Sequence, residues 1–154
     1  MGTGESRGSK RIAVIFFPGR VNRKKLEVEI ERVMSVGRWR APIWLPTSAD
    51  ASGGEQVLEA AAAGVTHILA AGGDGTLRAV LEAVALHAPQ ITVGIIPGGT
   101  GNVLARNLKL DRLTLAASVK RGLTAAPREI DLCKVSYVES DSGAKRIHHF
   151  ATIA

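Results

Sequence analysis

The chain has 154 residues, a formal net charge of +6 and a single cysteine, Cys133. This length accommodates one domain, or one domain joined to part of another, and a lone cysteine excludes internal disulfides and cysteine-based zinc sites. The sequence has no apolar run near the ~20 residues that a membrane-spanning helix needs. Residues 1–10 are polar and rich in glycine, and we expect them to be disordered.

Much of the positive charge lies early in the chain, where seven lysines and arginines between residues 20 and 40 accompany three glutamates. Such a field attracts nucleotides, anionic membranes and nucleic acids alike. We interpret the charges first as a solvated helix face. A base-stacking surface would need a series of aromatic side chains among them, so no nucleic-acid partner is expected.

Apolar runs alternate with helical spacing over residues 12–121, which predicts an α/β fold with a parallel sheet. The expected strands are 12–17, 43–45, 65–71 and 91–96. The expected helices are 23–36, 55–63, 76–86, 102–108 and 111–121, the last capped by Asp111. After Pro127 the pattern becomes a hairpin, with strands expected at 129–138 and 146–153. We therefore expect an α/β domain over 11–127 and the start of a second, β-rich domain over 128–154.

Two glycine-rich turns each follow an expected strand and precede a helical pattern. They read Gly72-Gly73-Asp74-Gly75-Thr76 and Pro97-Gly98-Gly99-Thr100-Gly101-Asn102. Glycines let the backbone approach an anion, and free N–H groups at a helix start point toward it. The carboxyl ends of parallel strands meet at one edge of a sheet. The two turns therefore predict a polyphosphate held from both sides.

The polar side chains of the turns suggest particular roles. Because Asp74 would repel a phosphate, it fits either a Mg²⁺ ion between the two anions or a hydrogen bond to a substrate or ribose hydroxyl. Thr76 is expected to cap its helix and donate to a phosphate, and Asn102 to cap the following helix. Thr100 offers a further hydroxyl. Arg106 is within one turn of the second loop, but we favour a surface salt bridge for it over a phosphate contact.

Other nucleotide-binding signatures are missing from the sequence. No eight-residue phosphate loop ends in Lys-Ser or Lys-Thr, and no Gly-x-Gly-x-x-Gly follows the first strand. His148 and His149 are adjacent on an expected strand, so their side chains should point to opposite faces and not share a metal ion.

The two turns, together with Ile96 to Leu108 and Arg128-Glu129-Ile130-Asp131-Leu132, resemble the diacylglycerol kinase catalytic family, which includes bacterial lipid kinases and sphingosine kinases. The resemblance covers residues 11–154. It implies a nucleotide-binding α/β domain followed by a β-sandwich, and transfer of the ATP γ-phosphoryl group to a lipid hydroxyl with Mg²⁺. The positive charge and the lack of a spanning segment fit a cytoplasmic protein that docks on the inner face of the membrane. The exposed edge of the expected hairpin leaves homo-oligomerisation open.

The resemblance also assigns residues. The cofactor-binding set that it implies, with the glycines of the second loop, is Thr47, Ala71, Gly72, Gly73, Asp74, Gly75, Thr76, Leu77, Gly98, Gly99, Thr100 and Asn102. Asp74 would position Mg²⁺ and phosphate for catalysis, and Asp131 would join the magnesium and water network.

This chain departs from the family pattern at three places. Phe17-Pro18-Gly19-Arg20 stands where the family often has Asn-Pro and a nearby glycine, and Val103 stands where many members have an aspartate. The Asp-Gly motif of the β-sandwich that supplies the catalytic base is absent. Two alternatives stay open: a relative of NAD kinases, whose second loop has a different pattern, and a non-catalytic module that senses nucleotides.

Overall fold

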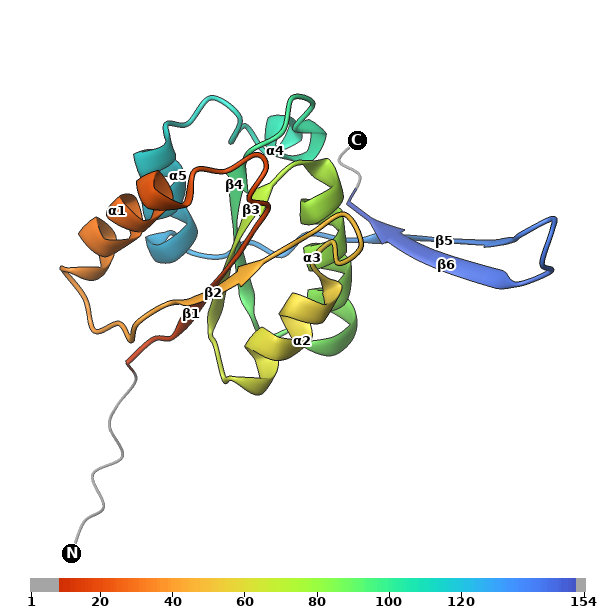
Figure 1. Cartoon of the computed structure of the whole chain (residues 1–154), viewed down its shortest axis with the longest axis horizontal. Helices are drawn as coiled ribbons and strands as arrows, with labels where there is room; N and C mark the ends of the chain where they lie inside the picture. Colours follow the sequence, from red (N-terminus) through yellow and green to blue (C-terminus); the bar gives the residue numbers. More distant parts are fainter. Residues whose placement is uncertain (1–8, 152–154) are drawn as a thin grey trace, which may run out of the picture.

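Residues 9–151 are described by the computed structural model (Figure 1). Four parallel strands form one sheet in the order β2-β1-β3-β4, which confirms the α/β prediction. The strands are β1 (Ile12–Phe16), β2 (Ile43–Pro46), β3 (His67–Gly72) and β4 (Thr92–Pro97). The helices are α1 (Arg23–Met34), α2 (Gly54–Ala62), α3 (Asp74–His87), α4 (Val103–Asn107) and α5 (Leu115–Thr124).

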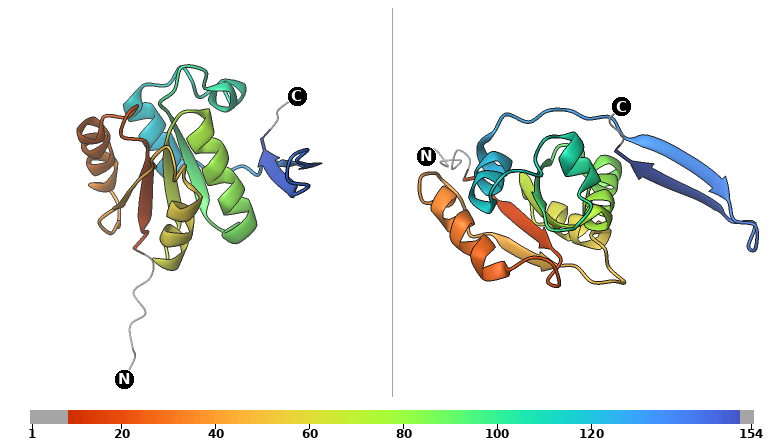
Figure 2. Two further views of the ribbon diagram at one scale, coloured as in Figure 1. Left: turned by 45° about the vertical axis from the view of Figure 1, so that its right-hand side comes forward. Right: turned by 90° about the horizontal axis from the view of Figure 1, so that it is seen from above.

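The sheet separates two apolar cores, because alternate side chains of a strand point to opposite faces. Ile15 of β1 packs in the core beneath α2 and α3, and its neighbour Val14 packs in the core beneath α1 and α5. Every residue of β1 is buried, as a continuous apolar run predicts for a strand covered on both faces. The two helical layers on either side of the sheet are visible in both views of Figure 2.

Close contact between two glycines seats α5 on the sheet. A Cβ on Gly94 of β4 would lie only 2.6 Å from the Cα of Gly122 in α5. Any larger residue at Gly94 would therefore force the helix away from the strand. The side chain of Leu69 fills the space beside both glycines.

The segment between α4 and α5 differs from its prediction. Helix α5 begins at Leu115, and its cap is Thr114, whose Oγ1 accepts the Ala117 N–H at 3.1 Å. Asp111 therefore does not cap it. The chain leaves α4 through turns, and Lys109 adopts a positive φ of 58° that ends the preceding helix.

The hairpin extends from the sheet domain as a separate two-stranded unit (Figures 1 and 2). Its strands are β5 (Cys133–Val138) and β6 (Lys145–Phe150), paired antiparallel around a turn at Gly143. The first strand is four residues shorter than predicted, because residues 129–132 have no neighbouring strand to pair with. The predicted end of the second strand lies partly outside the described residues.

The chain is ordered slightly earlier than predicted at its start. The backbone of Lys10 bonds to Arg38 and Arg40 in an isolated bridge beside Trp39, so ordered structure begins before residue 11. The expected disorder of residues 1–8 falls outside the described residues. Within residues 9–151, none of the helices has both the length and the apolar character that crossing a membrane requires.

Candidate functional site

The two glycine turns touch each other at the carboxyl ends of β3 and β4. The N–H of Gly98 donates to the carbonyl of Gly72 at 2.8 Å, continuing the pairing of the two strands. A Cβ on Gly99 would lie 2.8 Å from the Cα of Gly73. The backbones of the two turns are therefore closer than side chains would allow, which explains why both turns are rich in glycine.

Asn102 fixes the shape of the second turn. Its Oδ1 accepts the N–H of Gly99 at 3.0 Å, and its Nδ2 donates to the carbonyl of the same residue at 2.7 Å. Asn102 adopts the left-handed conformation, with φ 49° and ψ 45°, which asparagine tolerates better than most residues. The prediction that Asn102 caps α4 through its side chain is wrong, because both polar atoms of that side chain bind Gly99.

Asp74 caps α4 in place of Asn102. Its Oδ1 accepts the N–H of Val103 at 2.8 Å, linking the first turn to the helix that follows the second. Its other oxygen, Oδ2, lies beside Gly101, where an added Cβ would be only 2.9 Å away from it. The expected capping role of Thr76 is also wrong, since α3 begins at Asp74 after an N-cap glycine with no side-chain cap. The first N–H groups of α3 are thus left without a side-chain acceptor.

Arg106 supports the second turn through a hydrogen bond to its backbone. Its guanidinium donates to the carbonyl of Gly101 at 2.6 Å. Neither a salt bridge nor a direct position in the cleft is found for this arginine in the described residues. The Arg106 side chain therefore contacts the backbone of the turn and not the cleft, an arrangement that the sequence pattern did not predict.

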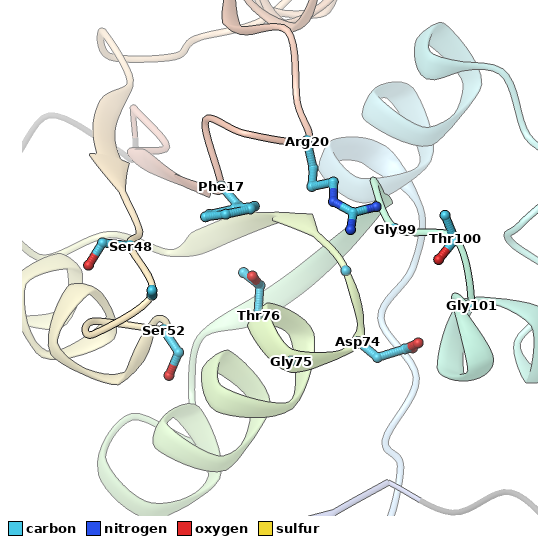
Figure 3. Close-up of a pocket in the computed structure, with 12 residues that line it drawn as sticks. Phe17, Arg20, Ser48, Ser52, Asp74, Gly75, Thr76, Gly99, Thr100 and Gly101 are labelled. Carbon is cyan, nitrogen blue, oxygen red and sulfur yellow. The ribbon is translucent and has the colours of Figure 1, made fainter.

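A cleft of about 380 Å³ opens above the two turns (Figure 3). Its lining comes from the ends of β1, β2, β3 and β4: Phe17, Arg20, Ser48, Ala49, Ser52, Gly73, Asp74, Gly75, Thr76, Gly99, Thr100 and Gly101. Ligands of parallel α/β sheets bind at this edge. The convergence of the two turns on one cleft confirms the expected geometry.

The cleft is chemically divided along its length (Figure 3). Ser48 and Ser52 lie at one end, Thr100 and Gly101 at the other, and Thr76 between them. Arg20 directs its guanidinium toward the end formed by the second turn. That end therefore combines a cation, glycine backbone and a hydroxyl, which suits an anionic ligand.

The predicted site residues divide into those that line the cleft and those that support it. Ala71 and Leu77 are buried beneath the turn, and Thr47 is 5% exposed with its hydroxyl donating to the carbonyl of Phe16 at 3.3 Å. Gly72 and Gly98 join the two turns through backbone contacts. Asp131 is exposed in the segment between α5 and β5 and does not line the cleft. The other predicted residues of the turns line it, except Asn102.

Six lining residues are outside the predicted set. One is Gly101, inside the second glycine turn, and the other five are Phe17, Arg20, Ser48, Ala49 and Ser52. These five follow β1 and β2, whose carboxyl ends share the edge occupied by the glycine turns. The same topological rule that places the glycine turns together also predicts these positions. The signal was therefore available in the strand order, although the residues lack a glycine motif.

The side chains of the adjacent residues His148 and His149 contact different partners, as expected for neighbours on a strand. His148 stacks on Tyr137, whereas both the N–H and Nδ1 of His149 lie within hydrogen-bond distance of Glu82 Oε1 on α3. Burial would raise the pKa of Glu82, but the bonds from His149 and the nearby Arg78 charge together lower it. Within residues 9–151, no cluster of three or more metal-ligating side chains is present.

Curated relatives match about half of this chain. A probable lipid kinase YegS-like protein of Pseudomonas putida is 46% identical over 78 residues, which cover 49% of this chain and 25% of the relative. A diacylglycerol kinase of Bacillus subtilis is 36% identical over 69 residues, which cover 45% of this chain and 23% of the relative. The matches therefore span about a quarter of the length of these relatives.

Solved structures share the fold over nearly the whole chain. A diacylglycerol kinase from Bacillus anthracis superimposes with a TM-score of 0.67 at 21% identity, covering 95% of this chain and 46% of that one. The sequence model of the diacylglycerol kinase catalytic domain matches residues 19–135, which include both glycine turns. Because this match covers well over half of the residues of this chain, the chain belongs to the diacylglycerol kinase catalytic domain family.

Proposed function

We propose that the chain is the nucleotide-binding part of a lipid kinase that transfers the γ-phosphoryl group of ATP to a lipid hydroxyl, such as that of diacylglycerol or a sphingoid base. The observation that carries this proposal is the contact between the two glycine turns beside one cleft. Phosphoryl transfer depends mainly on positioning and on neutralising the charge of the phosphates. Family membership and the names of the relatives support the lipid acceptor.

The phosphates would lie over the start of α3 and the second turn. The uncapped N–H groups at the start of α3 are oriented for an anion, and the 14-residue helix adds its dipole. Thr76 and Thr100 would donate hydroxyl hydrogen bonds, and Arg20 would supply countercharge. The ribose and base would then lie toward Ser48 and Ser52.

Asp74 would hold Mg²⁺ against the phosphates. One oxygen of this carboxylate accepts the N–H of Val103, while the other lies beside Gly101, 2.9 Å from the position that a Cβ on that glycine would take. Mg²⁺ prefers one or two carboxylates together with phosphate oxygens and water, so a single aspartate fits the ion. Asp131 would contribute through water only if its segment approached the cleft.

The two parts of the chain would have different roles in the kinase. Residues 11–127 would bind ATP, and residues 128–154 would begin a β-rich domain that supplies the catalytic base and the lipid cleft. The chain matches about a quarter of its curated relatives' length, so we infer that residues 1–154 alone turn over little lipid. We place the protein in the cytoplasm, peripheral to the inner face of the membrane, and the exposed hairpin edge would allow homo-oligomers.

Calorimetry of the Asp74→Asn variant tests the nucleotide site. With Mg²⁺ present, ATP affinity should fall at least about tenfold, because the carboxylate ligand is lost. In EDTA, the variant should bind ATP as well as the parent or better, since a negative charge beside the phosphates is gone. The fold should persist, because the asparagine carbonyl can still accept the Val103 N–H.

Asp141→Asn on the exposed hairpin turn is the matched control and should bind MgATP like the parent. Absence of ATP binding by the parent, or equal MgATP affinity in Asp74→Asn, would contradict the proposal. Phosphorylation of diacylglycerol by a protein that carries this chain at the full length of its curated relatives, lost in Asp74→Asn, would separate a kinase from a nucleotide sensor. Phosphorylation of NAD instead would support the NAD kinase alternative.

A further inference from the structure

One aromatic ring lies in the cleft. Phe17 ends the apolar run 12–17, so the sequence predicted a strand residue at this position. In the structure β1 ends at Phe16, and Phe17 lines the cleft among glycines, serines and threonines. Of the lining residues in the described part of the chain, Phe17 alone is aromatic. Aromatic side chains in a pocket commonly supply contact area for a ligand.

The two apolar cores do not use this ring. The preceding residue, Phe16, packs in the core beneath α1 and α5, so the alternation of a strand directs Phe17 to the other side of the sheet. Phe17 nevertheless belongs to neither core. It also belongs to none of the ring pairs found within residues 9–151. Its side chain is only partly buried, so part of the ring is available to a ligand.

Backbone hydrogen bonds hold Phe17 in a defined position. Its N–H donates to the carbonyl of Ala71 at 3.0 Å, so the chain stays paired with β3 for one residue beyond β1. Its carbonyl accepts the N–H groups of Arg20 at 3.0 Å and Val21 at 3.1 Å, which closes the following turn. A Cβ on Gly19 would lie only 3.1 Å from Cε1 of the ring, so this glycine leaves room for the ring. A ring held in this way loses little freedom when a ligand packs on it.

Phe17 lies between the two ends of the cleft. Figure 3 shows its ring above Thr76, with Ser48 to one side and the guanidinium of Arg20 to the other. The proposed function places the phosphates over the start of α3 and the second turn, and the base toward the serine end. The nucleoside of a bound ATP would therefore lie beside the Phe17 ring.

The side chains at the serine end carry no fixed pattern of hydrogen-bond donors and acceptors. They belong to Ser48, Ala49 and Ser52. A hydroxyl rotates and both donates and accepts, so a serine suits the N6 amino group of adenine and the O6 oxygen of guanine equally. The Oγ of Ser48 already accepts the N–H of Ala51 at 3.0 Å. Discrimination between bases needs groups that donate or accept at a fixed place, and these side chains do not supply them.

We propose that Phe17 holds the nucleobase of the phosphoryl donor by stacking, so that the site accepts ATP and GTP alike, an inference that rests on the proposed kinase function. Stacking on an aromatic ring tolerates any base, because every base has a π-face. A purine covers more of the ring than a pyrimidine does, so CTP and UTP would bind less tightly. The donor is therefore a purine nucleoside triphosphate, selected by the area of its base and not by hydrogen bonds to the base.

Calorimetry with Mg²⁺ present tests the proposal on the parent, Phe17→Leu and Phe17→Tyr. Leucine keeps an apolar side chain without a ring face, whereas tyrosine keeps the ring. The parent should bind ATP and GTP with affinities within about threefold of each other, because stacking tolerates either base. Phe17→Leu should weaken the binding of both by about fivefold or more. It should bind inorganic tripolyphosphate, which has no base, like the parent, and Phe17→Tyr should bind all three ligands like the parent.

Phe150→Leu is the matched control, because Phe150 lies in β6 and does not line the cleft. This variant should bind ATP and GTP like the parent. Because Phe17 belongs to neither core, Phe17→Leu should unfold in urea close to the midpoint of the parent. If Phe17→Leu failed to fold, the ratio of the ATP and GTP affinities of the parent would still decide the proposal.

Any of four results would overturn the stacking role. They are a preference of the parent for ATP over GTP of more than about tenfold, as sites that read a base by hydrogen bonds show, unchanged nucleotide affinity in Phe17→Leu, an equal loss of tripolyphosphate affinity in that variant, and binding by Phe17→Tyr as weak as by Phe17→Leu. ATP still binds the parent in each case, so the kinase proposal would stand. A parent that bound neither ATP nor tripolyphosphate would contradict the kinase proposal, and the stacking role with it.

Discussion

The sheet domain and the hairpin differ in how their strands are covered. Every residue of β1 is buried between two helical layers, whereas every residue of β5 is exposed. Both segments have strand-forming sequences, so propensity does not distinguish them. The difference is that helices before and after each parallel strand return to cover the sheet, while the hairpin is joined to the domain by a stretch without helix. Cooperative stability should therefore belong to the sheet domain.

The hairpin depends on a few polar contacts with helix α3 and within its own turn. Glu82 accepts from both the backbone and the ring of His149, and Arg146 pairs with Glu139 at 2.8 Å. Two-stranded hairpins are marginally stable by themselves in water. Exposed pairs of this kind add little. The contact of His149 with Glu82 is thus a weak joint between the hairpin and α3.

The largest predicted effect compares one apolar residue of each region. Leu69→Ala removes a fully buried side chain that packs beside two glycines, and should lower the free energy of unfolding by about 2–5 kcal/mol. Val135→Ala in β5, where the side chain is 42% exposed, should change it by less than about 0.5 kcal/mol. Urea unfolding followed by circular dichroism measures both. Similar losses in the two variants would refute the contrast.

The sequence predicted the sheet domain better than the hairpin for a related reason. The four parallel strands and their helices were predicted in the right places along the chain, because continuous apolar runs indicate strands buried on both faces and helical spacing indicates the helices that cover them. The start of β5 was misplaced at residue 129 because residues 129–132 alternate like a strand but have no partner. Strand pairing is a long-range property that a local pattern does not contain.

At the site, the glycines predicted where the backbones of the two turns approach each other closely. They did not predict which side chain caps helix α4 or which one holds the second turn in shape. Asp74 was expected to bind a cation or hydroxyl, and its bond to Val103 joins residues 29 positions apart. Asn102 was expected to cap a helix and instead holds Gly99. Contacts between two loops depend on how those loops are juxtaposed, and that follows from the strand order rather than from either motif.

Two glycines sharpen the comparison, because each region needs glycine for a different reason. Gly99→Ala places a Cβ 2.8 Å from the Cα of Gly73, so it should separate the turns and lower stability by about 1–3 kcal/mol. ATP affinity should fall with it. Gly143→Ala has open space around it, and its cost of about 1 kcal/mol comes from its φ of 65° alone.

The readouts differ accordingly. Gly99→Ala should lower the urea midpoint of the whole domain, whereas Gly143→Ala should leave that midpoint unchanged and raise amide exchange only in β5 and β6. If Gly143→Ala lowered the global midpoint as much as Gly99→Ala, the hairpin would be part of the cooperative unit. The proposed independence of the two regions would then be wrong.

The smallest predicted effect concerns the joint between the regions and its dependence on pH. The pKa of Glu82 lies below its ordinary value of 4.5, because the bonds from His149 and the charge of Arg78 outweigh burial. The ionised carboxylate therefore stabilises the docked hairpin above that ordinary value, and this contribution is lost as the pH falls through the lowered pKa. The expected size is less than about 1 kcal/mol.

Nuclear magnetic resonance can follow this joint through the amide shift of His149 between pH 7 and pH 3. In the parent, the shift should change below pH 4.5 as Glu82 is protonated and its bond to the amide weakens. Glu82→Gln should remove that transition, because its side chain does not titrate. Glu139→Gln, whose carboxylate pairs with Arg146 within the hairpin, should retain it. A transition that persisted in Glu82→Gln would assign the joint to another group and weaken the view that one carboxylate docks the hairpin on α3.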